Sequence, residues 1–395
     1  MLNRNYLGLT MAFSLATGIT TALAAPRGRL AYLQDGYAVI SDAATGQTKR
    51  LPGSKGTSAF AISPRGQSAY FVKQPGFEND GPIPQTGFLS LPPYKTARKL
   101  PAALQDETFG QLTWSPTGNT LWLRGFEIYG AYTPATNNFR KLSQLPESVS
   151  RNGKIIAYLG DDEIRVRDVN SGRERVIFSR KKPQVLFSAL RNGKNPKKIT
   201  DIIEGLDPAM WKEAINWAIS APALSPDGSR LYFCSNAGSG QGAAGNSSWA
   251  IFAADLKSGK IAVLSKVGAQ FGRMPETFEV SPDGKRLLAL VSVHSSAIDN
   301  PSCALVVDLP TQNSRELLGK VAPKSADSNL TWGACWSPDS RYVALAAYFY
   351  KTSDVLKQAN WNGPKDNQWT LYVQDAATGK VVRRIAGARS PSWAN

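Results

Sequence analysis

The chain has 395 residues, and 46 Lys and Arg residues against 30 Asp and Glu residues give it a formal net charge of +16. Its one histidine, His294, excludes a His-rich metal site and leaves a Ser-His-Asp triad only a single candidate base. Its three cysteines, Cys234, Cys303 and Cys335, form at most one bridge, which excludes a disulfide framework and favours buried thiols.

The first 25 residues have the layout of a cleaved secretory signal. Arg4 supplies a positive charge, an apolar run extends from Leu7 to Leu23, and small residues follow up to Ala25. No later stretch reaches the roughly 20 apolar residues that span a bilayer. We therefore expect residues 26–395 to form a single exported domain, which works in the periplasm or outside the cell.

One turn recurs along the whole chain and predicts its architecture. Its form is Ser-Pro-x-Gly after a hydrophobic residue. Good copies begin at Ser63, Ser115, Ser225 and Ser281, and degenerate copies begin at Ser150 and Ser337. Proline fixes φ at the second position of the turn, and Asp or Asn followed by Gly supports the positive φ that reverses the chain. Each copy therefore predicts a hairpin between two antiparallel strands.

The segments after these turns predict the remaining strands. Apolar and polar residues alternate with the period of a half-buried strand over 68–72, 120–123, 155–159, 231–234, 287–291 and 342–346. A third strand then ends in Asp before a Gly-containing turn, and the same five residues, D-A-A-T-G, begin at Asp42 and at Asp375. More charged fourth strands are expected at 47–51, 95–100, 138–142, 173–178, 260–264, 314–318 and 380–385.

Four antiparallel strands, the last one polar, form a blade of a β-propeller. The count gives seven blades, but the first has no innermost strand near the N-terminus. Residues 390–395 supply it, because Trp393 matches Trp114 and Trp336, which stand just before their turns. We predict an all-β, seven-bladed propeller of four-stranded antiparallel blades, in which the N- and C-terminal segments close one blade.

The repeated turn resembles that of TolB-like, WD40-like propeller proteins of the bacterial periplasm, and also that of the propellers of prolyl-oligopeptidase-like enzymes. The resemblance covers nearly the whole chain after residue 25 and implies the propeller fold. The sequence has no room for the α/β domain that precedes the propeller in TolB, and it has no G-x-S-x-G elbow of a hydrolase domain. Propellers host many unrelated activities, so no functional residue is carried over.

Residues 179–219 interrupt the repeat between the fourth and fifth blades. They are basic up to Asp201, and Asn195-Pro196 and Asp207-Pro208 have the form of helix starts. We expect two short helices, roughly at 196–204 and 208–217, with apolar stripes. This basic helical insertion is either a solvated cap on the propeller or an element that docks a partner. An irregular eighth blade is the third alternative.

Strand direction decides on which face each connection lies. Connections from the second to the third strand, and from the last strand to the next blade, share one side, here named the loop-rich face. The long segments 73–86, 235–248, 292–302 and 348–368 fall there, together with 179–219. The Ser-Pro-x-Gly turns lie on the opposite side, here named the short-turn face. Because loops on rigid scaffolds carry function, the loop-rich face is the expected binding surface, and tolerated loop drift is the alternative.

Basic and aromatic residues predict how this face binds. Aromatic side chains among cations suit a protein interface, a sugar or a nucleic-acid base, and export makes nucleic acid the least expected of these. The residues expected to contact a partner are Lys181, Lys182, Arg191, Lys194, Lys197, Lys198, Trp211, Tyr350 and Trp361.

The sequence thus predicts a non-catalytic scaffold that binds a protein partner of the cell envelope, with no cofactor or metal. The net positive charge favours an acidic partner, an anionic polysaccharide or a membrane surface. The alternative is a carbohydrate- or lipid-active propeller, either a binding protein or a hydrolase or lyase, with its site at the mouth of the central channel. His294 as a general base is conceivable but less expected than a solvated loop histidine.

Overall fold

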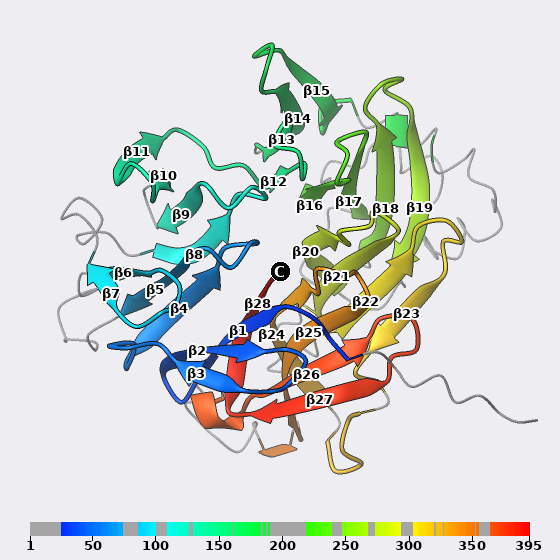
Figure 1. Ribbon diagram of the computed structural model, residues 1–395. Coiled ribbons are helices and arrows are strands. Elements are labelled where there is room, and N and C mark those ends of the chain that lie inside the picture. Colours follow the sequence, from blue (N-terminus) through cyan, green and yellow to red (C-terminus); the bar gives the residue numbers. More distant parts are fainter. Residues whose placement is uncertain are drawn as a thin grey trace, which may run out of the picture.

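A computed structural model of the protein describes residues 25–73, 86–99, 109–125, 129–160, 162–182, 185–186, 189, 219–238, 247–267, 273–293, 303–319, 321–326, 328–351, 353–354 and 364–395. These residues form seven four-stranded antiparallel sheets. The sheets are the blades of a propeller, arranged in a ring with the C-terminus at its centre (Figure 1). The predicted all-β, seven-bladed fold is confirmed.

Each blade is given from its innermost to its outermost strand. Blade 1 is β28 (Ala388–Ala394), β1 (Arg29–Gln34), β2 (Tyr37–Asp42) and β3 (Thr48–Arg50). Blade 2 is β4 (Thr57–Ile62), β5 (Ala69–Lys73), β6 (Thr86–Ser90) and β7 (Ala97–Lys99). Blade 3 is β8 (Phe109–Trp114), β9 (Leu121–Gly125), β10 (Tyr129–Thr133) and β11 (Asn138–Leu142). Blade 4 is β12 (Ser148–Val149), β13 (Ile155–Leu159), β14 (Glu163–Asp168) and β15 (Glu174–Ser179).

The remaining three blades have longer second strands. Blade 5 is β16 (Ile219–Leu224), β17 (Arg230–Gly238), β18 (Ser247–Asp255) and β19 (Ile261–Val267). Blade 6 is β20 (Arg273–Val280), β21 (Arg286–Val293), β22 (Cys303–Asp308) and β23 (Ser314–Leu317). Blade 7 is β24 (Ser328–Trp336), β25 (Tyr342–Tyr350), β26 (Thr370–Asp375) and β27 (Val381–Ala386), with a 3-10 helix, η2 (Asp366–Gln368), before β26.

The two ends of the chain close blade 1, as predicted. Strand β28 pairs with β1 in antiparallel register, which places Trp393 opposite Leu30. The indole Nε1 of Trp393 donates a hydrogen bond to the backbone oxygen of Arg27 at 2.9 Å. Because the C-terminal strand is the innermost strand of an otherwise N-terminal sheet, the ring is closed by strand pairing and hides the edges of both segments.

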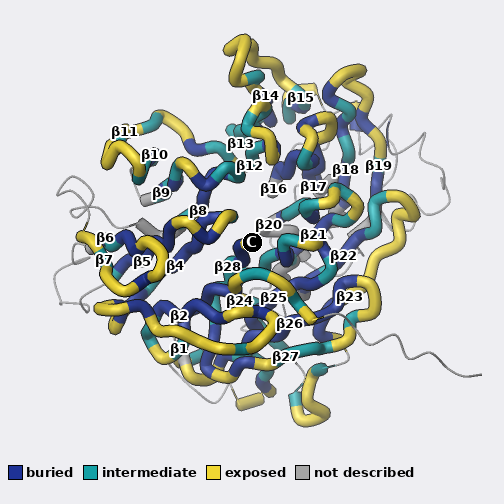
Figure 2. The backbone as a smooth tube through the Cα atoms, viewed as in Figure 1, coloured by how far each residue is buried: buried dark blue, intermediate teal, exposed yellow. Residues whose placement is uncertain are grey.

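The core consists of clusters of buried hydrophobic residues between neighbouring blades. Six such clusters join blades 1 and 2, 2 and 3, 4 and 5, 5 and 6, 6 and 7, and 7 and 1. Figure 2 shows burial along the inner strands and exposure along the outer ones. In the part of the chain that the structure describes, no cluster of this kind joins blades 3 and 4. A groove of about 500 Å³ lies there instead, lined by Trp122, Tyr158 and the basic side chains of Arg140 and Arg165.

The serine of each Ser-Pro-x-Gly turn holds its hairpin together. Its hydroxyl oxygen accepts a hydrogen bond from the backbone N–H five residues later, over 2.8–3.1 Å, in the turns that begin at Ser63, Ser115, Ser150, Ser225, Ser281 and Ser337. The glycine of the Ser281 turn, Gly284, has φ +72°, a conformation that glycine adopts without strain. Ser340 occupies the glycine position of the Ser337 turn, and its hydroxyl accepts a hydrogen bond from the N–H of Asp283 in blade 6 at 2.9 Å.

Substitution of Ser281 by alanine is expected to lower the free energy of unfolding by about 1–2 kcal/mol, because it leaves the part-buried N–H of Arg286 without its acceptor. Ser281 is fully buried, whereas Ser314 on β23 is exposed and serves as the matched control. Urea denaturation of both variants measures the difference. Equal midpoints for Ser281→Ala and Ser314→Ala would contradict a stabilising role for the turn serine.

Two sequence predictions about loops are wrong in detail. The sequence predicts a loop from Tyr348 onward, but Tyr348, Phe349 and Tyr350 are the last residues of β25 and pair with residues 328–330 of β24. Residues 235–238 likewise extend β17 and pair with residues 247–250 of β18. The aromatic run has strong β propensity, and a paired neighbouring strand lets it continue the hairpin beyond the alternating segment.

The helical insertion between blades 4 and 5 is not confirmed. Its two predicted helices, at 196–204 and 208–217, lie outside the described residues. Within the insertion, Val185, Leu186 and Ala189 have helical backbone, and Leu186 and Ala189 join the buried cluster between blades 4 and 5. No helix among the described segments has the length and apolar character needed to cross a membrane.

Candidate functional site

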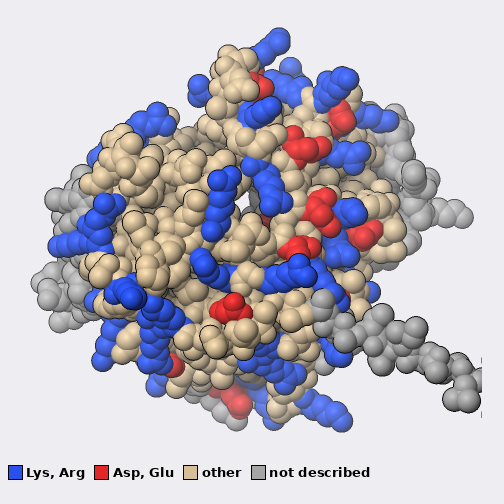
Figure 3. Space-filling view, in the orientation of Figure 1, with Lys and Arg blue, Asp and Glu red and all other residues tan. Residues whose placement is uncertain are grey.

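A cavity of about 520 Å³ occupies the central channel at its short-turn end. All seven blades contribute to its wall, and the prolines of five turns form much of it: Pro64, Pro116, Pro226, Pro282 and Pro338. Figure 3 shows the ring from the side on which the C-terminus lies, with an opening near its centre. A concave, partly apolar site reached by residues of every blade is the usual place for a ligand.

A repeated position on the innermost strands links each blade to the next. It lies two residues before the turn serine, or before Ala394 in blade 1. The hydroxyl oxygen of Ser148 in blade 4 accepts a hydrogen bond from the N–H of Leu224 in blade 5 at 2.9 Å. Ser392 in blade 1 does the same for Ile62 in blade 2 at 3.2 Å. The full set at this position is Ala61, Thr113, Ser148, Ala223, Glu279, Cys335 and Ser392.

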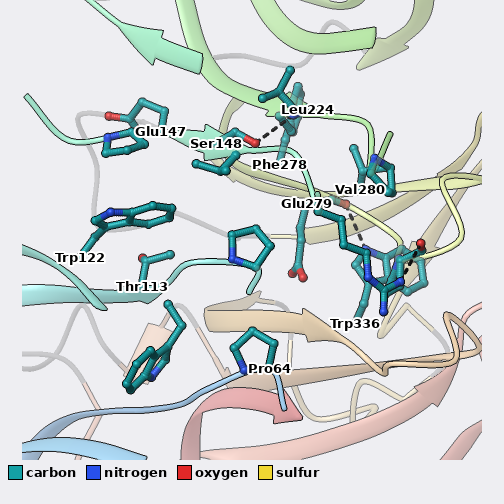
Figure 4. A pocket seen from close by; sticks show the side chains of 18 of the residues that line it. Pro64, Thr113, Trp122, Glu147, Ser148, Leu224, Phe278, Glu279, Val280 and Trp336 are labelled. Atoms are coloured by element: carbon teal, nitrogen blue, oxygen red, sulfur yellow. Dashed lines mark hydrogen bonds between the residues drawn. The ribbon is translucent and has the colours of Figure 1, made fainter. Parts of the chain in front are cut away.

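Glu279 is the one acidic residue at this repeated position. Its carboxylate accepts a hydrogen bond from the backbone N–H of Trp336 in blade 7. Ser148 and Ser392 make the same contact to the next blade through their hydroxyl oxygens. Figure 4 shows the carboxylate pointing into the cavity. Burial raises the pKa of Glu279 from 4.5 to about 7, although the hydrogen bond from Trp336 acts in the opposite direction. Within the described residues, Glu279 forms no ion pair, so its carboxyl is a candidate functional group.

Cys335 on β24 is the titratable neighbour of Glu279. Burial raises the pKa of the Cys335 thiol well above its usual 9.0, and the charge of Glu279 raises it further. The thiol is free, as is that of Cys234, which is fully buried. Both thiols are therefore neutral near pH 7 and have the inert character expected from the sequence. The side chain of Cys303 lies outside the described residues.

Tryptophan side chains supply the aromatic part of the cavity wall. The Nε1 groups of Trp114 and Trp336 donate hydrogen bonds to the backbone oxygens of Ala61 and Glu279, at 3.2 and 3.0 Å, each in the preceding blade. Trp393 and Trp122 also line the cavity. Because three of these indole N–H groups are bound to backbone oxygens, their rings offer a ligand mainly their carbon surface.

Charged groups at the rim are unevenly distributed. The guanidinium of Arg124 is paired with the carboxylate of Glu147, and its buried Nε has no hydrogen-bond partner among the residues that the structure describes. Arg151 of blade 4 reaches across to the backbone oxygen of Pro282 in blade 6 at 3.2 Å. The turns of blades 5, 6 and 7 each carry an aspartate next to the proline: Asp227, Asp283 and Asp339. Figure 3 shows acidic side chains gathered on one side of the opening. Among the described side chains, no group of His, Cys, Asp and Glu is placed to hold a metal ion.

The structure places three of the residues that were predicted to contact a partner. Lys181 and Lys182 follow β15 and are exposed, and the Lys181 Nζ lies 3.5 Å from the Asp162 carboxylate. Tyr350 ends β25 and is buried. The other predicted residues, namely Arg191, Lys194, Lys197, Lys198, Trp211 and Trp361, lie outside the described residues, as does His294, and remain predictions.

A row of aromatic rings lies toward the loop-rich end of blade 7. Ring centroids are 5.9 Å apart for Trp332 and Trp369, 6.3 Å for Trp369 and Tyr348, and 5.7 Å for Tyr348 and Tyr350. Trp332 is 54% exposed, and the guanidinium of Arg389 lies 5.7 Å from its ring centroid. We name Trp332, Trp369, Tyr348, Tyr350 and Arg389 the aromatic row.

Sequence reasoning missed Glu279 and Trp332. The sequence contains a signal that could have identified Glu279. When the repeats are aligned, the position two residues before the turn serine holds one acidic residue and otherwise only small ones. Trp332 had none, because an exposed tryptophan on an inner strand looks in sequence like the buried Trp114 or Trp336.

Comparisons with known proteins support the fold. No family model and no curated protein matches the sequence. Among solved structures, the tricorn protease matches with a TM-score of 0.53 at 13% identity, over 93% of this chain and 34% of that chain. The chain thus spans about a third of that protein's length.

Two bacterial propellers also match. A putative TolB from Agrobacterium tumefaciens has a TM-score of 0.42 and 14% identity, over 74% of this chain and 86% of that chain. The periplasmic gluconolactonase of Pseudomonas aeruginosa has a TM-score of 0.47 and 13% identity, over 93% and 99%. At these identities a likeness concerns the fold alone. The fold is a seven-bladed β-propeller, as the TolB-like repeat predicted.

Proposed function

We propose that this chain is an exported, non-catalytic propeller that binds an acidic protein partner of the cell envelope through its loop-rich face. The observation that carries the proposal is the exposure of Trp332 at 54% within the aromatic row. Tryptophan and arginine dominate the binding energy of protein interfaces, because their large flat groups bury much area with few rotatable bonds. The leader-like residues 1–25 support export to the periplasm or beyond.

The topology places the aromatic row on the loop-rich face. Strand β24 runs toward the short-turn face and ends at Trp336, so its earlier residues, including Trp332, lie toward the other end. Strand β25 ends at Tyr350 before a long connection, and Arg389 lies near the start of β28. Trp369 contacts Trp332 edge to face, with ring centroids 5.9 Å apart, and 54% of Trp332 remains exposed for a partner.

The charge of this face supports an acidic partner. Lys181 and Lys182 leave β15 on the same side of the ring as the aromatic row, and Arg389 stands over Trp332. The net charge of +16 adds a long-range attraction for acidic surfaces, which accelerates their association. Anionic polysaccharides and membrane surfaces share this attraction, and the experiment below distinguishes them by the contribution of Trp332.

Substitution of Trp332 by alanine is expected to weaken binding of the partner by about 30-fold, the effect of removing a central aromatic anchor. Partners are first recovered from an envelope extract with the full chain and identified. The dissociation constant of the purified partner is then measured for wild type and variant at low and high salt.

Leu91→Ala is the matched control, because Leu91 is 51% exposed in the β6–β7 turn of the short-turn face. It is expected to leave affinity unchanged. If Trp332→Ala bound the same partner as tightly as wild type, the aromatic row would not be the docking surface. Recovery of polysaccharide or lipid alone, with no dependence on Trp332, would contradict a protein partner.

The channel cavity favours a second candidate, a carbohydrate- or lipid-active propeller. Its tryptophans and the Glu279 carboxyl suit a polar ligand with an apolar face. Hydrolysis of a glycoside generally requires two free carboxyl groups, and the carboxylate of Glu147 is paired with Arg124. Ligand binding therefore fits this cavity better than hydrolysis.

A further inference from the structure

We propose that the channel cavity is a binding site for a small organic ammonium ligand, whose charged group meets the carboxylate of Glu279. This site is separate from the partner surface proposed above, because it lies at the short-turn end of the channel. The proposal does not depend on that partner.

The shape of the cavity suits a small molecule. Its volume of about 520 Å³ falls within the range of ligand pockets, and tryptophan and proline side chains form its apolar wall. Trp336 and Glu279 lie on neighbouring inner strands, and the Nε1 of Trp336 is bound to the backbone of Glu279. Trp336 is 3% exposed, so it fixes the position of Glu279 within an apolar wall, and the carboxylate supplies the counter-charge for an organic cation.

Glu279 provides more than the inter-blade contact requires. Ser148 and Ser392 link neighbouring blades with a single hydroxyl oxygen at the same repeated position. The carboxylate has two oxygens and a negative charge, and it points into the cavity (Figure 4). A charged group in a partly desolvated place without an ion-pair partner is unfavourable until an opposite charge arrives. An ammonium group supplies that charge.

The electrostatics of the rim favour a cation on the side of Glu279. Asp283 belongs to the turn that directly follows Glu279, and Asp227 and Asp339 belong to the turns on either side. The described wall of the cavity contains two arginines, and one of them, Arg124, is already paired with Glu147. The guanidinium of Arg151 is held at the rim by the backbone oxygen of Pro282. Although the chain has a net positive charge, neither arginine of the cavity wall forms an ion pair with the carboxylate of Glu279.

The test compares benzylammonium with benzyl alcohol, which has nearly the same shape and no charge. Isothermal titration calorimetry of the full chain at about pH 8, where Glu279 is mostly ionised, should show the amine binding about tenfold more tightly than the alcohol. Glu279→Gln keeps the size and an acceptor oxygen but removes the charge. It should lower the affinity for the amine about tenfold, to that for the alcohol.

Two further variants separate binding from folding. Glu279→Ser restores the residue that other blades use, so it should fold with an unchanged circular dichroism spectrum and also lose the preference for the amine. Glu316→Gln removes an exposed carboxylate from β23 and should change neither affinity. Equal affinity of wild type for amine and alcohol, unchanged affinity in Glu279→Gln, or no heat of binding at about 10 mM amine would each overturn the proposal.

Discussion

Substitution of Trp393 by alanine is expected to lower the free energy of unfolding by about 3–5 kcal/mol, the range for truncating a buried large aromatic residue. Trp393 is 8% exposed and packs in the cluster between blades 7 and 1 with Tyr342 and Leu30. Its indole N–H also binds the backbone oxygen of Arg27. The substitution therefore removes buried area and takes this donor away from the backbone oxygen of Arg27, just before β1.

Denaturation by guanidinium chloride, followed by circular dichroism, measures this effect. Trp332→Ala is the matched control, because Trp332 is the same residue type but more than half exposed, and it is expected to change stability by about 1 kcal/mol or less. A loss for Trp393→Ala no larger than that for Trp332→Ala would show that the ring does not depend on this closure.

Stability is expected to fall by about 2 kcal/mol as the pH rises from about 4.5 to about 7, because of Glu279. Burial raises the pKa of this carboxyl to about 7 in the folded chain, while in the unfolded chain it ionises near 4.5. Between these values the unfolded state has lost a proton that the folded state still holds, so a rising pH favours unfolding. The figure allows for the solvent that reaches a half-buried side chain.

The titratable and charged groups that share the cavity with Glu279 are not expected to cause this pH dependence. Cys335 on β24 titrates well above it, since burial and the charge of Glu279 both raise the pKa of its thiol. Arg124 and Glu147, which face the same cavity, form an ion pair with each other. Glu279→Gln is therefore expected to flatten the pH profile and to be more stable than wild type at about pH 8.

Urea denaturation at a series of pH values measures the slope, with Glu316→Gln as the control that should keep the wild-type profile. An equal slope in wild type and Glu279→Gln would contradict the assignment. Glu279→Gln also tests the ammonium site, but through a different measurement. The preference for amine over alcohol is measured with ligand by calorimetry, whereas the change of unfolding free energy with pH is measured without ligand.

Below this range the aspartates of the outer turns act in the opposite direction. In Asp42, Asp168 and Asp255, hydrogen bonds from the backbone N–H and the hydroxyl of the third following residue lower the pKa of the carboxyl. Their contribution to stability is complete above the ordinary value of 3.8 and is lost as the pH falls through the lower folded value. Stability is therefore expected to be greatest just below the pH at which Glu279 begins to weaken the fold.

The sequence by itself determined the architecture. The turns at Ser63, Ser115, Ser225 and Ser281 recur with the same local chemistry, so each hairpin could be predicted without knowledge of its neighbours. The match of Trp393 to Trp114 and Trp336 predicted ring closure. It indicated that the C-terminal segment is the innermost strand that the first blade lacks near the N-terminus.

The tertiary structure alone decided which inner-strand side chains face the channel and which positions stay exposed. The position of Glu279 repeats in sequence, but its burial, its raised pKa and its place in a shared cavity depend on six other blades. The exposure of Trp332, the burial of Tyr350 and the groove between blades 3 and 4 also arise between sheets. Local sequence determines hydrogen bonds within a hairpin, whereas burial and electrostatics depend on residues brought together from distant parts of the chain.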